Sequence, residues 1–239
     1  MKLKIIPLLA ICFVNYLGAQ QKRTIGSVER LLTEMDQYVA PGAEIEILAE
    51  DFGWSEGPVW VDRLNAVIFS DVPSNKIYKW DEKDGLSVFL DPSGFTGIAP
   101  REKKGSLNAE NRDESGSNGL VLDDNGDLNI CMHGDRRIAR LDDWDKNTFS
   151  TIIGKYQGKF FNSPNDLVFA KNGDLYFTDP PYGLKKGDQD PLKELDFNGV
   201  FKLTPSGSLS LIIEDLTRPN GIAISDDQKT LYVAISDPK

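Results

Sequence analysis

Residues 165–179 read NDLVFAKNGDLYFTD, and they contain the pattern that recurs along the chain. The apolar runs 167–169 and 175–177 lie on either side of the turn KNGD at 171–174. Short apolar runs separated by an Asn-Gly turn are typical of a β-hairpin. We therefore predict two antiparallel strands here, preceded by the polar residue Asn165.

The same pattern recurs along the chain as a structural repeat. In each copy a polar residue and a turn-like residue precede the first strand, and a tight turn and a second strand follow it. We predict first strands at 56–61, 118–123, 165–170 and 220–225, second strands at 67–71, 128–131, 175–179 and 231–234, third strands at 76–80, 137–141 and 199–203, and fourth strands at 86–90, 149–153 and 209–213.

Four short antiparallel strands per repeat predict an all-β fold of the β-propeller type, in which each repeat forms one blade. A β-sandwich is the alternative, but a sandwich gives no reason for a polar residue to recur before each first strand. The fourth copy holds only two predicted strands before the sequence stops at Lys239. We therefore expect an incomplete propeller of about three and a half blades, cut from a longer parent.

Two long insertions, at 91–117 and 183–198, interrupt the repeat. Loops of this length are usually functional or disordered. Their position before or between blade strands predicts a rim around one mouth of the propeller channel.

The N-terminus predicts export. Lys2 and Lys4 precede an apolar stretch at 5–17, and small residues at 18–19 precede Gln20. These are the parts of a signal peptide, which we assign to residues 1–19. The protein is therefore expected to be secreted or periplasmic.

A buried N-terminal helix and a lipid anchor at Cys12 are the alternatives. The abrupt polar run after residue 19 disfavours the helix. The bulky Ile11 before Cys12 disfavours the anchor.

The remaining chain divides into a lead-in at 20–43 and a propeller domain at 44–239. The lead-in has apolar residues at helical spacing over 28–39, which predicts a short amphipathic helix. Pro41 and Gly42 end that pattern.

Composition excludes several classes of partner. The chain has 27 Lys and Arg against 37 Asp and Glu, a formal net charge of −10, so no nucleic-acid partner is expected. No later stretch approaches the roughly 18 apolar residues that a membrane span needs. Cys131 is the single cysteine outside the predicted signal peptide, so we expect no disulfide and predict a core residue. The sequence indicates no obligate protein partner.

One repeat position is polar in every copy: it is occupied by Glu56, Asn118, Asn165 and Asn220. First strands line a propeller's channel, so these side chains are expected to meet near the axis. One carboxylate and several amide oxygens suit Ca²⁺, which takes about 6–8 oxygens. Alternatively, these residues cap the turns that lead into the strands. Repeat position alone leaves both readings open.

Several separated motifs resemble the gluconolactonase, senescence marker protein (regucalcin) and luciferin-regenerating enzyme family. They are FGWSEGPVW at 52–60, SPND at 163–166 and RPNG at 218–221. Three further motifs look like the bacterial secreted branch of that family: SNGL at 117–120, HGDRR at 133–137 and TDPPYG at 178–183. The resemblance runs from about Glu44 to Lys239.

The resemblance implies a six-bladed β-propeller with one catalytic divalent cation, usually calcium, on its axis. Glu56 and Asn220 match metal ligands of the family, and Asn165 matches a residue that contacts metal or substrate. We therefore predict Glu56, Asn165 and Asn220 as ligands of a Ca²⁺ cofactor. Asn118 is assigned to substrate binding.

The sequence departs from the family pattern at one point. The family has an Asp before Gly at this repeat position in a later blade, where it is both ligand and candidate base. No residue here matches it, because Asp237 ends a second strand. The catalytic base is therefore unknown, and we expect the 239 residues by themselves to be impaired in catalysis.

Three further residues are predicted to contact substrate: His133, Asp179 and Tyr182. His133 ends a predicted second strand, where it contacts substrate or satisfies a backbone carbonyl. Asp179 and Tyr182 begin a loop that could overhang the channel mouth. Turn chemistry explains Asp179 equally well.

The implied reaction is hydrolysis of a small sugar lactone. The cation polarises the ester carbonyl, and a carboxylate activates water. One alternative is hydrolysis of phosphorus esters, as in the related diisopropylfluorophosphatase fold. Another is a non-catalytic extracellular propeller that binds a sugar or partner and uses the metal structurally.

Overall fold

The structure is a computed structural model that describes residues 22–101 and 114–236. The chain forms two compact units that divide between Glu50 and Asp51, and each is described by itself. The predicted signal peptide, Cys12, Asp237 and residues 102–113 of the first insertion lie outside the described residues.

In the first unit, residues 22–50, helix formation is more limited than the sequence predicts. In place of a helix over 28–39 there is the 3-10 helix η1 (Thr33–Gln37), which buries none of its residues. A helix this short needs an apolar face packed against a partner, and its N-cap residue, Leu32, makes no side-chain capping bond. A single antiparallel bridge, Thr24 with Glu46, joins the two arms of this segment.

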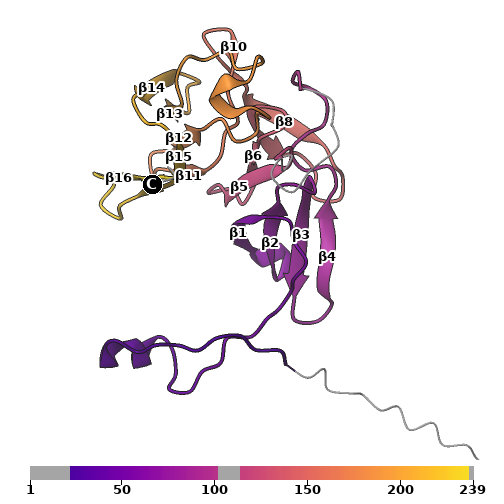
Figure 1. Cartoon of the computed structure of the whole chain (residues 1–239), viewed down its shortest axis with the longest axis vertical. Coiled ribbons are helices and arrows are strands. Elements are labelled where there is room, and N and C mark those ends of the chain that lie inside the picture. Colours follow the sequence, from indigo (N-terminus) through magenta and orange to yellow (C-terminus); the bar gives the residue numbers. More distant parts are fainter. Residues whose placement is uncertain (1–21, 102–113, 237–239) are drawn as a thin grey trace, which may run out of the picture. The chain divides into compact units, whose positions relative to one another are not determined.

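The second unit consists of antiparallel sheets that follow one another along the chain (Figure 1). Among the described residues, three sheets have four strands in sequential order, and two sheets have two strands. Blade 1 contains β1 (Ser55–Val61), β2 (Ala66–Asp71), β3 (Lys76–Asp81) and β4 (Gly85–Leu90). Blade 2 contains β5 (Ser117–Leu122), β6 (Leu128–Met132), β7 (Arg137–Leu141) and β8 (Phe149–Ile153). Blade 3 contains β11 (Leu167–Phe169), β12 (Leu175–Asp179), β13 (Gly199–Leu203) and β14 (Leu209–Ile213), and the last sheet contains β15 (Pro219–Ile224) and β16 (Leu231–Ile235).

This order confirms the all-β repeat predicted from the sequence. Each predicted strand is present, and no strand end shifts by more than two residues. The turns η2 (Asp62–Leu64) and η3 (Gly187–Gln189) are short 3-10 segments outside the sheets.

One hairpin was not predicted. Strands β9 (Lys155–Tyr156) and β10 (Lys159–Phe160) pair with each other across Gln157 and Gly158, which both have positive φ. Positive φ at both central residues is the requirement of a tight type I′ turn. The strands are too short to show a periodic pattern in the sequence.

Blade 2 is apolar on both faces because it packs between two other blades. Successive side chains of β6 point to opposite faces of the sheet. Ile130 and Met132 accordingly join the core shared with Ile68 of blade 1, and Cys131 joins the core shared with Phe177 of blade 3. Cys131 is fully buried, so the prediction of a core residue is confirmed.

Aromatic packing dominates the core behind blade 3. The rings of Phe161, Phe177 and Phe201 are all fully buried, with centroids 5.1 or 5.2 Å apart. Truncating one such ring to Ala typically costs about 3–5 kcal/mol. This core supports the short inner strand β11.

Glycines let neighbouring blades approach closely at their inner strands. A Cβ on Gly57 would lie 2.5 Å from the Asn118 carbonyl oxygen, and one on Gly119 would lie 2.8 Å from the Asn165 carbonyl oxygen. Gly57 also has a positive φ of 57°. Glycine at these positions is therefore required by the packing of one blade on the next.

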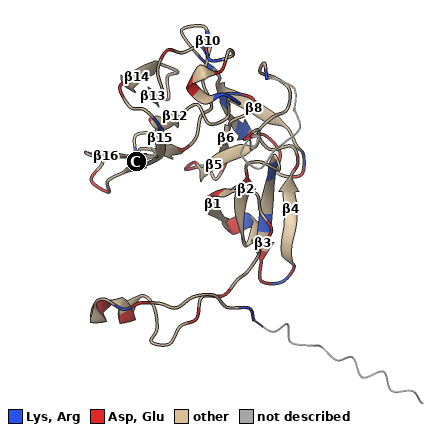
Figure 2. Ribbon diagram, viewed as in Figure 1, with Lys and Arg blue, Asp and Glu red and all other residues tan. Residues whose placement is uncertain are grey.

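The described part of the chain contains no helix with the length and hydrophobicity needed to cross a bilayer. Figure 2 shows acidic residues mainly in turns and loops, with basic residues interspersed among them.

Candidate active site at the inner strands

The starts of the first strands lie side by side, blade after blade. The Gly119 amide donates a hydrogen bond to the Asn165 carbonyl at 2.8 Å, and the Ile222 amide donates one to the Asp166 carboxylate at 2.9 Å. On the other side of blade 2, Gly57 lies against the Asn118 carbonyl. Glu56, Asn118, Asn165 and Asn220 thus occupy matching positions on neighbouring sheets, and we call these four residues the ring.

Two hydroxyl groups, which the sequence analysis did not single out, strengthen the contacts between neighbouring blades. Ser70 Oγ on β2 donates to the Asn118 carbonyl at 2.8 Å. Thr178 Oγ1 on β12 donates to the Asn220 carbonyl at 2.7 Å. Both hydroxyls hold the backbone of a ring residue on the following blade. Ser70 and Thr178 occupy the same position of the repeat, and this shared position could have identified them from the sequence.

The ring residues differ in exposure. Asn118 and Asn165 are buried, at 6% and 3% exposure, whereas Glu56 and Asn220 are partly exposed. The Glu56 carboxylate accepts a hydrogen bond from the Trp54 indole, which keeps it beside an exposed aromatic surface. No described residue donates a hydrogen bond to the side-chain Oδ1 of Asn118, Asn165 or Asn220.

The donor set of the ring fits a hard cation. One carboxylate and three amide oxygens match the oxygen ligands that Ca²⁺ prefers. Among the described residues, no group of three or more His, Cys, Asp or Glu side chains is arranged to hold a metal. A site in this part of the chain therefore depends on the asparagine oxygens. The assignment of Glu56, Asn165 and Asn220 as ligands stays a prediction.

His133 follows β6 directly and is fully buried behind the ring. Its Nε2 lies 3.4 Å from Asn165 Nδ2. Burial, reinforced by the charge of Arg101, lowers the pKa of His133 to about 3, so the imidazole is neutral near neutral pH. The structure therefore gives His133 a ring residue as its neighbour; substrate contact stays a prediction.

Asp179 is fully buried beneath the loop that leads to Asn165. Its two carboxylate oxygens accept hydrogen bonds from the Asn162 and Ser163 amides, each at 2.8 Å. Burial raises the pKa of Asp179 to about 7, although these hydrogen bonds and the charges of Arg136 and Lys193 act in the opposite direction.

Blade 1 repeats this device. Asp71, at the matching end of β2, accepts a hydrogen bond from the Trp54 amide at 2.9 Å. Trp54 and Ser163 each precede a ring residue by two positions. Asp179 therefore holds the backbone that leads to the ring residue Asn165. Its contact with substrate stays a prediction.

Tyr182 lies near Asn220. Its hydroxyl is buried. Burial raises the pKa of Tyr182, while the side chains of Asn220 and Ser236 act to lower it. The phenol of Tyr182 is therefore placed beside a ring residue.

Two charged residues near the site were not singled out from the sequence. Arg101 donates from Nη1 to the Gly183 carbonyl at 2.6 Å. The Glu114 carboxylate Oε2 lies 4.0 Å from His133 Nδ1. Both residues flank the segment 102–113, far from any strand pattern, so only the tertiary structure reveals their position.

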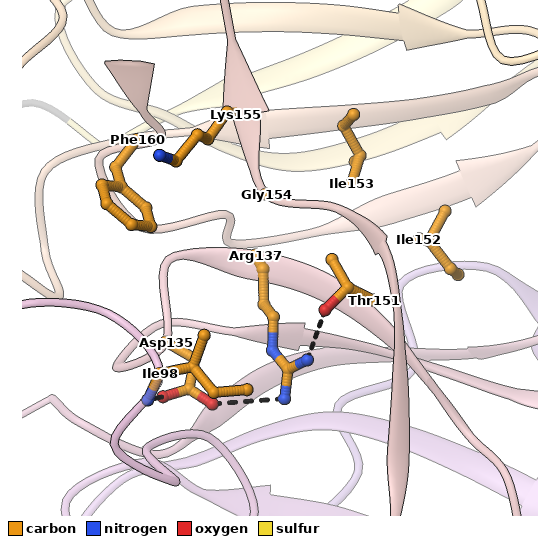
Figure 3. A pocket seen from close by; sticks show the side chains of 9 residues that line it. All are labelled: Ile98, Asp135, Arg137, Thr151, Ile152, Ile153, Gly154, Lys155 and Phe160. Carbon is orange, nitrogen blue, oxygen red and sulfur yellow. Dashed lines mark hydrogen bonds and ion pairs between the residues drawn. The ribbon is translucent and has the colours of Figure 1, made fainter. Parts of the chain in front are cut away.

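A hollow lies on the outer side of blade 2, with a volume of about 480 Å³ (Figure 3). Its polar wall is the ion pair of Arg137 and Asp135, whose Nη2 and Oδ2 atoms are 3.3 Å apart. Arg137 also donates to Thr151 Oγ1 at 2.5 Å. The ring residues do not line this hollow; the lining residues are Ile98, Asp135, Arg137, Thr151, Ile152, Ile153, Gly154, Lys155 and Phe160.

Comparison with known families finds one match that spans most of the chain. Residues 54–239 match the model described as the SMP-30/Gluconolactonase/LRE-like region. The matched range begins two residues before Glu56 and includes all four ring residues.

Individual relatives agree with this match. A gluconolactonase of Zymomonas mobilis subsp. mobilis is 43% identical over 214 residues, which are 90% of this chain and 58% of that protein. A solved gluconolactonase structure from Xanthomonas campestris is 34% identical with a TM-score of 0.65, covering 81% of this chain and 58% of that one. The chain therefore spans less than two thirds of the length of these relatives.

A more distant structure shares the fold. A luciferin-regenerating enzyme is 15% identical with a TM-score of 0.53, covering 79% of this chain and 54% of that one.

Proposed function

This chain belongs to the SMP-30/gluconolactonase/LRE-like family, and from that membership we propose that it is a calcium-dependent hydrolase of sugar lactones. The observation that carries the proposal is the register of the ring on neighbouring blades. Four residues far apart in sequence share one position, and no described residue donates a hydrogen bond to the side-chain Oδ1 of its three asparagines. The name of the 43% identical relative supports the choice of lactones over phosphorus esters.

The residues of the ring have separate tasks in this proposal. Glu56, Asn165 and Asn220 hold the ion, with Glu56 as the one negatively charged ligand. Bound calcium would polarise the lactone carbonyl and stabilise the negative charge that develops on its oxygen. Asn118 and the Tyr182 hydroxyl bind the sugar hydroxyls, and Asp179 holds the loop that positions Asn165.

The proposal includes weak turnover by these 239 residues. The family's Asp before Gly has no match at the ring position, so no residue here takes its combined role as ligand and base. We expect calcium binding to survive this loss better than catalysis, because the remaining ligands still supply the carboxylate and the amide oxygens.

Calorimetric titration with CaCl₂, combined with a pH-stat assay on glucono-lactone, tests the proposal. We expect one calcium site and slow lactone opening that a chelator abolishes. The calcium proposal is wrong if no binding heat is detected. The expected impairment is wrong if hydrolysis is fast and sensitive to chelation.

Export is part of the same proposal. A lactonase with residues 1–19 removed would act outside the cytoplasm, in the periplasm or the medium. N-terminal sequencing of the mature protein from its native host tests this point, and Gln20 is the expected first residue. Retention of Met1 would contradict it.

A further inference from the structure

We propose that His133 is a positioning residue that sets the direction of the Asn165 amide, so that the nitrogen faces the imidazole and the oxygen faces the ring. This inference rests on the proposed function, because it assigns the direction of a proposed ligand. It concerns the tautomer of the neutral His133 imidazole and the contact of His133 with Asn165.

An asparagine at a cation site has two faces of opposite character. Oδ1 is an acceptor that can ligate a cation, whereas the Nδ2 group donates and repels it. The two orientations differ by a half-turn of the amide, so a neighbour must favour one of them. Asn165 is 3% exposed, and bulk water therefore does not perform this selection.

The neighbour at Asn165 is the imidazole. His133 Nε2 lies 3.4 Å from Asn165 Nδ2, and both residues are buried. A neutral imidazole has one N–H and one acceptor nitrogen. If Nε2 is the acceptor, it receives the Asn165 N–H, and Oδ1 is directed away from His133.

The surroundings of the other nitrogen select that tautomer. His133 Nδ1 faces the Glu114 carboxylate, whose Oε2 is 4.0 Å away, beyond hydrogen-bond distance. A carboxylate can only accept, and its negative charge attracts an N–H, so the proton is favoured on Nδ1 and Nε2 is left as the acceptor. Glu114, His133 and Asn165 thus follow one another toward the ring, with contacts of 4.0 Å and 3.4 Å.

This arrangement has a defined energetic consequence. Partners that orient a metal ligand typically change metal affinity by about 10- to 100-fold when removed. The effect arises because the amide then points its oxygen toward the ring for only part of the time. If His133 were purely structural, replacing it would lower stability without a specific effect on calcium affinity.

Nitrogen-15 spectroscopy tests the tautomer directly. His133 is the single histidine of the chain, so ¹⁵N-labelled histidine in protein made without a histidine tag gives one imidazole. We expect a protonated Nδ1 and an unprotonated Nε2 in the calcium-free protein. The opposite tautomer would overturn the proposal, because Nε2–H requires Asn165 Oδ1 as its acceptor.

Two substitutions test the consequence for calcium. His133→Leu removes the acceptor, and we expect calcium affinity, measured by calorimetry with CaCl₂, to fall by about 10- to 100-fold. His133→Gln removes the same ring but offers an amide oxygen near the place of Nε2, and we expect affinity within a few-fold of the unaltered chain. Equal affinity in all three proteins would overturn the positioning role, as would an equal loss in both variants.

The two experiments separate this inference from the proposed function. If the unaltered chain does not bind calcium, the calcium proposal fails, and the ¹⁵N spectrum still decides which way the Asn165 amide points. If His133→Leu fails to fold, the tautomer and the His133→Gln variant decide the question.

Discussion

Blade 2 takes part in two polar clusters that are built in opposite ways. On its outer side lies the flank cluster, formed by Asp135, Arg137, Thr151 and the backbone of residues 96–98 (Figure 3). On its inner side lies the ring. The flank cluster is a charge pair that forms many hydrogen bonds within the fold. The ring is a set of side-chain oxygens that form few such hydrogen bonds.

The difference can be followed through two carboxylates. Asp135 accepts hydrogen bonds from the amides of Thr96, Gly97 and Ile98 and from the Thr96 hydroxyl, and it pairs with Arg137. The hydrogen bond found for Glu56 within the described chain comes from the Trp54 indole. A buried group with all its partners inside the fold contributes to stability, whereas oxygens without partners are available to a ligand. The two clusters should therefore respond differently to substitution.

The largest expected effect is on calcium binding at the ring. Glu56→Gln keeps the side-chain shape and removes the only carboxylate of the ring, so we expect calcium affinity to fall by more than about 100-fold. The melting temperature of the calcium-free protein should not change, because Glu56 is partly exposed. Calorimetry and thermal melts measure the two quantities.

Glu82→Gln is the matched control, since Glu82 is exposed in a turn of blade 1. If Glu56→Gln unfolds the protein without calcium, the ring is structural and the contrast between the clusters is lost.

At the flank cluster we expect a loss of stability without a change in calcium affinity. Asp135→Ala leaves the buried Arg137 guanidinium without its counter-charge, which typically costs about 3–5 kcal/mol. Urea denaturation measures this loss, and exposed Asp124→Ala serves as the control.

Adding Arg137→Met to Asp135→Ala should restore part of the stability, because the uncompensated charge is removed. A change in calcium affinity in either variant would show that the two clusters are coupled.

Asp179 lies between these extremes, because it has internal partners but holds the approach to the ring. Its pKa is raised from 3.8 to about 7, mainly by burial, so the folded chain binds this proton more tightly than the unfolded chain. The resulting stabilisation is complete below the unfolded pKa and is lost as the pH rises through about 7.

We therefore expect the free energy of unfolding, relative to Asp179→Asn, to fall by a few kcal/mol between about pH 4 and pH 8. Urea titrations of both proteins across this range provide the measurement. Parallel pH profiles for the two proteins would contradict the assignment.

The smallest expected effect is at Cys131, which occupies the repeat position of Ser70 and Thr178. Those two residues donate hydroxyl hydrogen bonds to ring carbonyls. Burial raises the pKa of the Cys131 thiol, so we expect no reaction with thiol reagents in the folded protein.

Cys131→Ser should change stability by only about 1 kcal/mol, since the hydroxyl can form the bond that the repeat predicts. Cys131→Ala, which offers no donor, is the comparison in urea denaturation. A larger loss for Ser than for Ala would show that this position is only a packing site.

The sequence predicted the blades well because each hairpin is a local structure. Asn-Gly and similar turns bring adjacent apolar runs together, and the polar residue before each first strand marks the repeat. The β9–β10 hairpin escaped detection because two-residue strands have no period. The helix expected over 28–39 is reduced to η1 because spacing alone does not supply a packing partner.

By itself the sequence determined the strand order, the shared position of Glu56, Asn118, Asn165 and Asn220, and the family. The tertiary structure decided what surrounds them: Asp179 beneath the loop, His133 against the Asn165 amide, and Glu114 against the imidazole. A periodic pattern records which residues share a strand position, because that depends on neighbours in the chain. Hydrogen-bond partners and burial depend on residues that are distant in sequence, so they exist only once the blades are packed together.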